Sequence, residues 1–138
     1  MKAVFLALLL PVLANAAEPL TDEPITEERQ EGLKILTDVQ VRLGALRATL
    51  FEEQKWSEIL RIPYYWQRKE AVALEEALDD PHTGPSDLQR GVQAVKYNYQ
   101  LLSAIINYQG VSHPVRALKE QLDITVQDLE TLVMTIPD

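Results

Sequence analysis

The sequence predicts an all-α protein, an antiparallel helical bundle of four helices that follows a cleaved signal peptide. Apolar residues recur at spacings of three and four along several long segments, which is the period of amphipathic helices. Clusters of proline, glycine and aspartate separate these segments. No segment alternates apolar and polar residues with β-branched enrichment, so no strand is expected.

The N-terminus has the pattern of a secretory signal peptide. Lys2 precedes an apolar run from Ala3 to Leu13, and the next residues, 14–16, have the small Ala-Asn-Ala pattern that signal peptidase reads. The run is shorter than the ~20 residues that a membrane-spanning helix needs. We therefore expect cleavage after residue 16 and no transmembrane anchor afterwards. An extended leader over residues 17–25 should then precede a single helical-bundle domain over residues 26–138.

The first helix is expected to begin after Thr26, a good N-cap, because Glu27 and Glu28 then complement the helix dipole in the first turn. One apolar seam runs along this helix: Leu36, Val39, Leu43, Leu46 and Leu50. From Trp56 onward the apolar stripe is rotated. The helix should therefore break, kink or change face near residues 52–55.

Pro63 decides between two versions of the bundle. Proline disfavours a helical conformation at the preceding residue and suits the first position of a helix, so a second helix is expected from Pro63 to about Leu78. Its inner face would contain Ala71, Leu74 and Leu78. However, the joint at Pro63 has no glycine, and Pro63 could instead kink one long helix in a bundle of three. The sequence leaves both versions open.

The third helix has the most regular pattern. It follows a loop of turn-forming residues from Asp79 to Pro85, and Ser86 with Gln89 has the pattern of a capping box at its start. Its seam is formed by Leu88, Val92, Val95, Tyr99, Leu102 and Ile106. Gly110 is expected to end it.

The fourth helix should run from Ser112 or His113, next to Pro114, to about Pro137. Its apolar face would contain Val115, Leu118, Leu122, Leu129 and Leu132. The third and fourth helices have similar lengths and a short connection, so they should form an antiparallel hairpin. The seams are regular enough that a homodimer could complete a larger bundle.

Charge and cysteine content restrict the location and the partners. Loss of Lys2 with the signal peptide leaves 12 of the 13 Lys and Arg against 21 Asp and Glu, a net charge of −9. Such an acidic domain disfavours nucleic acid and anionic membrane surfaces and allows a basic partner. The chain has no cysteine, so an exported domain must be stable without disulfides. This combination favours a periplasmic location over a eukaryotic secretory route.

The sequence favours a non-catalytic protein without cofactor or metal. Beyond the signal peptide, His82, His113 and Met134 are not arranged in the motifs of haem, di-iron, copper or zinc sites. No nucleophile elbow or phosphate-binding loop is present. The acidic loop near Asp79 and Asp80 offers oxygen ligands for calcium, but its spacing differs from that of an EF-hand, and a solvated helix end that leads into a loop explains it better.

The segment from Arg61 to Lys69 is the main candidate for binding. Tyr64, Tyr65 and Trp66 are consecutive and spread over about 200° of a helix, so a bundle core cannot bury all three. Arg68 lies beside them, and Tyr, Trp and Arg are enriched where binding energy concentrates. The segment either covers the end of the bundle or contacts a partner.

A second aromatic group lies on the third helix. Tyr99 is on the seam and should be in the core, whereas Tyr97 and Tyr108 lie off it. These two side chains could join Trp56 and Trp66 around a small apolar ligand.

Two functions therefore remain. The favoured one is an interaction protein of the cell envelope with a protein partner, such as a chaperone, an inhibitor or immunity-type partner, or an accessory subunit. The alternative is a small-ligand-binding or sensor bundle with an aromatic-lined pocket. An internal void beside Trp56, Trp66 and Tyr97 would favour the ligand, and a packed core with aromatics outside would favour the partner.

Overall fold

The described residues fold into four long helices and contain no strand. The computed structural model describes residues 24–137, so the expected signal peptide and most of the leader lie outside the described part. The four helices are α1 (Glu27–Glu52), α2 (Glu58–Leu78), α3 (Pro85–Gln109) and α4 (His113–Met134). For these residues, the prediction of an all-α fold with four helices is confirmed.

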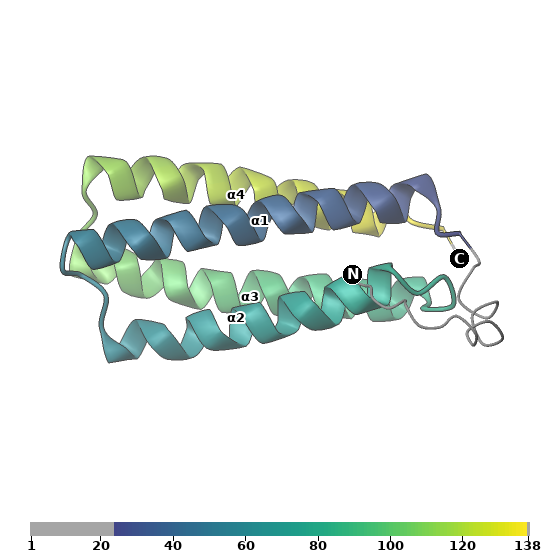
Figure 1. Ribbon diagram of the computed structural model, residues 1–138, viewed down its shortest axis with the longest axis horizontal. Helices are drawn as coiled ribbons and strands as arrows, with labels where there is room; N and C mark the ends of the chain where they lie inside the picture. The colour runs from purple at the N-terminus through teal and green to yellow at the C-terminus, as the bar shows by residue number, and fades with distance from the viewer. Residues whose placement is uncertain (1–23, 138) are drawn as a thin grey trace, which may run out of the picture.

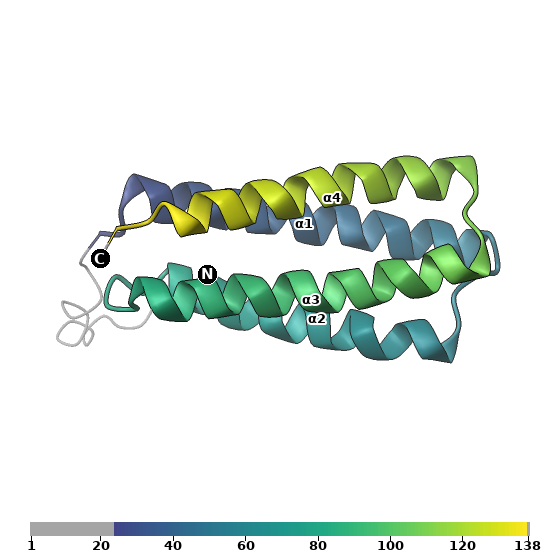
Figure 2. The same ribbon diagram turned by 180° about the vertical axis from the view of Figure 1, so that it is seen from behind.

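The helices lie side by side as a bundle, and consecutive helices run in opposite directions (Figure 1). They form a ring in which α1 packs mainly on α4, and α2 mainly on α3. Seen from behind, α3 and α4 form the second hairpin (Figure 2). Of the neighbouring pairs, α1 and α2 share the fewest contacts. This pair is therefore the place where the bundle surface can be hollowed.

The core is formed by the seams that the sequence predicts. In α1, α2 and α3 every expected core position is buried, including Tyr99. Its hydroxyl donates a hydrogen bond to Asp123 Oδ1 at 2.7 Å. Burial and this hydrogen bond raise the pKa of the Tyr99 phenol far above its usual value. Tyr99 is therefore a neutral donor that joins α3 to α4.

The buried face of α4 is rotated from the expected one. Two of the five expected core residues are only partly buried: Leu118 and Leu132. Four residues that were not expected are buried: Lys119, Thr125, Val126 and Val133. Residues one position apart lie about 100° apart on a helix, so a small rotation exchanges them at the edge of the apolar face. Packing against both α1 and α3 selects the rotation.

The chain reverses at residues 53–57 and not at Pro63. Gln54 has a φ of 58°, so a non-glycine residue supplies the left-handed conformation of this turn. Pro63 lies in the second turn of α2 and is buried on the same face as Leu60 and Gln67. The expected helix start at Pro63 and the bundle of three helices are therefore wrong, whereas the four helices and the break near residues 52–55 are confirmed. Burial of this face outweighs the backbone hydrogen bond that proline cannot donate.

The ends of α3 and α4 follow simple capping rules with one difference from expectation. The N-cap of α3 is Gly84, with Pro85 in the first helical turn, so Ser86 lies inside the helix and is not the cap. Proline is favoured there because its fixed φ is already helical. Gly110 ends α3 with a φ of 98°, as predicted. Ser112 caps α4 and accepts a hydrogen bond from the backbone N–H of Val115.

Arg29 holds the end of α2 against the start of α1. Its guanidinium donates to the carbonyl oxygens of Ala77 at 3.2 Å and Asp80 at 2.9 Å, and also to that of Thr83. The side chain is buried although it is charged. A cation at this point complements the C-terminal end of the α2 dipole. The acidic residues that follow α2 are therefore compatible with the helix without a bound metal.

Candidate functional site

The face formed by α1 and α2 is hollowed along its length. One hollow of about 700 Å³ lies near the α1–α2 turn, and a second of about 330 Å³ lies farther along the same two helices. They share Arg68 and Val72 in their walls, so they adjoin. We call the two together the α1–α2 groove. It lies where the two helices pack least closely.

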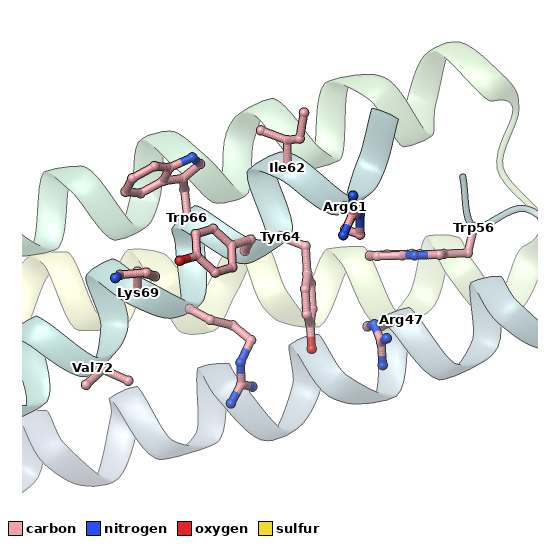
Figure 3. A pocket seen from close by; sticks show the side chains of 10 residues that line it. Arg47, Trp56, Arg61, Ile62, Tyr64, Trp66, Lys69 and Val72 are labelled. Carbon is pink, nitrogen blue, oxygen red and sulfur yellow. The ribbon is translucent and has the colours of Figure 1, made fainter. Parts of the chain in front are cut away.

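Aromatic side chains build the larger hollow from two directions. Trp56 comes from the turn, and Tyr64 points from α2 toward α1, while Ile62 and Trp66 leave α2 on the opposite side (Figure 3). The rings of Trp56 and Tyr64 meet edge to face, with centroids 5.3 Å apart. Both are partly buried against the core, so their positions are fixed by packing.

Tyr65 and Trp66 remain exposed on the wall of the groove. Their exposed fractions are 52% and 48%. Their rings meet edge to face with centroids 5.4 Å apart, so each limits the rotation of the other. The prediction that the core cannot bury all three consecutive aromatics is confirmed. Tyr64 packs on the core, as a covering residue would, whereas Tyr65 and Trp66 face outward.

Four cationic side chains line the same hollow: Arg47, Arg61, Arg68 and Lys69. The Arg47 guanidinium lies 4.8 Å from the ring centroid of Phe51 and 5.3 Å from those of Trp56 and Tyr64. Lys69 Nζ lies 5.8 Å from the Tyr65 ring centroid. Cations at these distances are attracted to the ring faces. Aromatic rings therefore restrain two of the cationic side chains in the groove, Arg47 and Lys69.

The structure brings five of the seven predicted site residues together. They line the larger hollow: Trp56, Tyr64, Tyr65, Trp66 and Arg68. Tyr97 and Tyr108 are not among its lining residues and are exposed on α3, with exposed fractions of 61% and 93%. Sequence reasoning missed Arg47 and Phe51. The available signal was that Arg47 and Phe51 are four residues apart and lie off the α1 seam. Side chains at this spacing are neighbours on a helix surface.

The described residues hold no arrangement typical of a metal site. Across residues 24–137 no three His, Asp or Glu side chains are grouped so that they could hold a metal ion. Asp79 and Asp80 follow α2 in the loop that Arg29 anchors. His113 is the first residue of α4, and His82 lies in the loop before α3, where its backbone N–H donates to Asp80 Oδ1 at 2.9 Å.

No protein-family model, curated protein or solved structure matches this chain. Among the described helices none is long and apolar enough to cross a membrane. The groove offers ring faces, apolar side chains and cationic donors on a rigid two-helix wall. These groups can recognise a partner by stacking, burial and charge.

Proposed function

We propose that this chain is an exported, non-catalytic protein of the cell envelope that binds a partner protein through the α1–α2 groove. The observation that carries the proposal is the exposure of Tyr65 and Trp66 beside a core that the helix seams fill without them. Large aromatic side chains that are rigid and exposed are typical anchors of protein interfaces. We propose a periplasmic location from the N-terminal pattern alone.

The shape of the groove favours a polypeptide. Its walls on α2 extend from Arg61 to Glu75, which is ~21 Å at 1.5 Å per helical residue. An extended segment of about six residues, or a helix of about 14, has that length. The groove lies on the outer face of the bundle, which makes it accessible to a segment of a larger protein.

A small ligand is the alternative, and one observation supports it. The larger hollow has a volume of about 700 Å³, which is within the usual range for small-molecule sites. A screen of small aromatic acids by thermal shift tests this function directly. A ligand that raises the midpoint of unfolding of the protein, but not of a Trp56→Ala variant, would favour the alternative.

Export predicts a defined N-terminus. If the protein is expressed from its full chain in a bacterium and recovered from the periplasmic fraction, we expect its first residue to be Ala17. Intact mass spectrometry measures this directly. Protein that stays in the cytoplasm with residues 1–16 attached would contradict the periplasmic assignment.

The binding role predicts that capture of the partner depends on Tyr65 and Trp66 but not on the exposed aromatics Tyr97 and Tyr108. We expect Tyr65→Ala with Trp66→Ala to weaken capture of an envelope partner at least about 30-fold, since truncating a hot-spot residue typically costs 2 kcal/mol or more. Pull-down from an envelope extract, followed by quantitative mass spectrometry, measures the loss.

The matched control is Tyr97→Ala with Tyr108→Ala, which removes two exposed aromatic rings that do not line the groove. These substitutions should leave capture of the same partner unchanged. Equal loss in both double variants would mean that the groove has no special role, and retention by both would mean that the aromatics only cover the bundle.

A further inference from the structure

The local charge of the groove is opposite to the charge of the whole protein. The chain has a net charge of −8, with 21 acidic residues. Yet the larger hollow is lined by four cationic side chains and by no Asp or Glu. Arg61 pairs with Glu58 at 2.9 Å, so Arg47, Arg68 and Lys69 carry the positive charge of the hollow. Net charge alone allows a basic partner. However, salt screens charges over roughly 10 Å, so a segment bound in this groove interacts mainly with the charges that line it. The groove therefore favours an acidic occupant.

We propose that the α1–α2 groove binds an acidic, amphipathic segment of its partner protein. Carboxylates of the segment pair with Arg47, Arg68 and Lys69, and its apolar side chains contact the exposed aromatic and aliphatic groups beside these cations. This inference rests on the proposed function, because it names the chemistry of the segment that the same groove binds.

Arg47 is positioned for a carboxylate before any partner arrives. Its guanidinium lies within 5.3 Å of the ring centroids of Phe51, Trp56 and Tyr64, which restrict where the side chain can go. Guanidinium is weakly hydrated and presents a planar fork of donors that matches a carboxylate. Binding a carboxylate there therefore orders less side-chain freedom than binding at a mobile lysine.

The groove also gives the segment a direction. The smaller hollow is lined by apolar and neutral polar residues of α1, with Glu75 of α2 at its far end. An acidic side chain beside Glu75 would be repelled, whereas one beside Arg47 or Lys69 would be attracted. The acidic part of the segment therefore lies toward the α1–α2 turn, and its apolar part extends along Leu36 and Val41.

An anionic membrane surface fits these observations less well. Arg47 comes from α1, whereas Ile62 and Trp66 leave α2 on the side away from α1 (Figure 3). A flat surface that touched Ile62 and Trp66 would therefore lie on the side of α2 away from Arg47. The net charge of −8 would also repel an anionic surface.

The test is a selection of random 12-residue peptides displayed on phage, against protein purified after expression of the full chain. Peptides that also bind an Arg68→Glu, Lys69→Glu variant are removed. We expect the remaining peptides to be enriched in Asp and Glu next to Leu, Ile, Phe or Trp. The Kd of a selected peptide is then measured by fluorescence anisotropy and should rise as salt is added.

The matched control reverses two cations outside the groove, Lys34→Glu with Arg90→Glu. Both double variants change the net charge equally, and Lys34 and Arg90 do not line the groove. We expect Arg68→Glu with Lys69→Glu to raise the Kd at least about tenfold, and the control to change it less than about threefold. If the first variant does not fold by circular dichroism, Arg68→Gln with Lys69→Gln should still raise the Kd.

The remaining outcomes overturn the inference in distinguishable ways. Selected peptides that depend on the groove but are rich in Lys and Arg would leave the proposed function intact and refute the acidic segment. Equal loss of binding in both charge-reversed variants would show that only net charge matters. Failure to select any groove-dependent peptide, or sedimentation with vesicles that contain 30% phosphatidylglycerol, would also refute it, while the envelope pull-down tests the proposed function separately.

Discussion

Replacing Arg29 by methionine is expected to lower the free energy of unfolding by about 3 kcal/mol. The guanidinium donates to three carbonyl oxygens, those of Ala77, Asp80 and Thr83. Hydrogen bonds that involve a charged group contribute roughly 1.5–3 kcal/mol each. The substitution also removes the free-energy cost of desolvating the buried charge, which offsets part of the loss. Urea unfolding followed by circular dichroism measures the loss.

The same substitution on a surface arginine supplies the control. Arg42 also belongs to α1 but pairs with Asp38 on the surface, with N–O distance 3.0 Å and partly exposed side chains. Arg42→Met should change the free energy of unfolding by less than about 1 kcal/mol. Arg29→Lys keeps the charge without the fork of donors and should recover only part of the stability. If Arg29→Met and Arg42→Met are equally stable, the anchoring role of Arg29 is refuted.

The core of this fold could be predicted from the sequence because it depends on local periodicity. The seams of the first and third predicted helices are buried throughout, since a spacing of three and four places apolar side chains on one face wherever the helix packs. The start of α2 could not be predicted in this way. The local preference of proline indicated a helix start at Pro63, but burial of Leu60 and Pro63 against the other helices extends α2 back to Glu58.

The candidate site could be predicted only in part, for a similar reason. Consecutive aromatics at positions 64–66 must leave some rings outside the core whatever the fold. The roles of Arg47 and Arg29 depend on groups far along the chain or across a turn that a seam analysis does not place. Arg29 bonds to carbonyls 48 to 54 residues away. Such contacts are fixed by the packing of the helices, and not by the local sequence.

The amide pair between Gln40 and Gln67 gives the second large expected effect. Substitution of the more exposed partner is expected to be the more harmful of the two. Gln67 Nε2 donates to Gln40 Oε1 at 2.8 Å, and Gln40 Nε2 donates to Gln67 Oε1 at 3.3 Å. Gln67 is fully buried, with an exposed fraction of 0%, whereas Gln40 is partly exposed in the wall of the groove. The pair joins α1 to α2, the neighbours that pack least closely.

Gln40→Leu should therefore be more harmful than Gln67→Leu, although the second change is made at the more buried position. The first leaves the buried amide of Gln67 without its partner, which costs about 2–3 kcal/mol. The second leaves Gln40, which water can reach, and should cost about 1 kcal/mol. The double variant replaces both amides by apolar groups and should be nearly as stable as the original protein, because no buried donor or acceptor is left unpaired.

Urea midpoints of the four proteins form a double-mutant cycle, and additive losses in it would show that the two amides do not act as a pair. Recovery in the double variant would instead mean that this polar link sets how α1 and α2 fit together along the groove while adding little net stability.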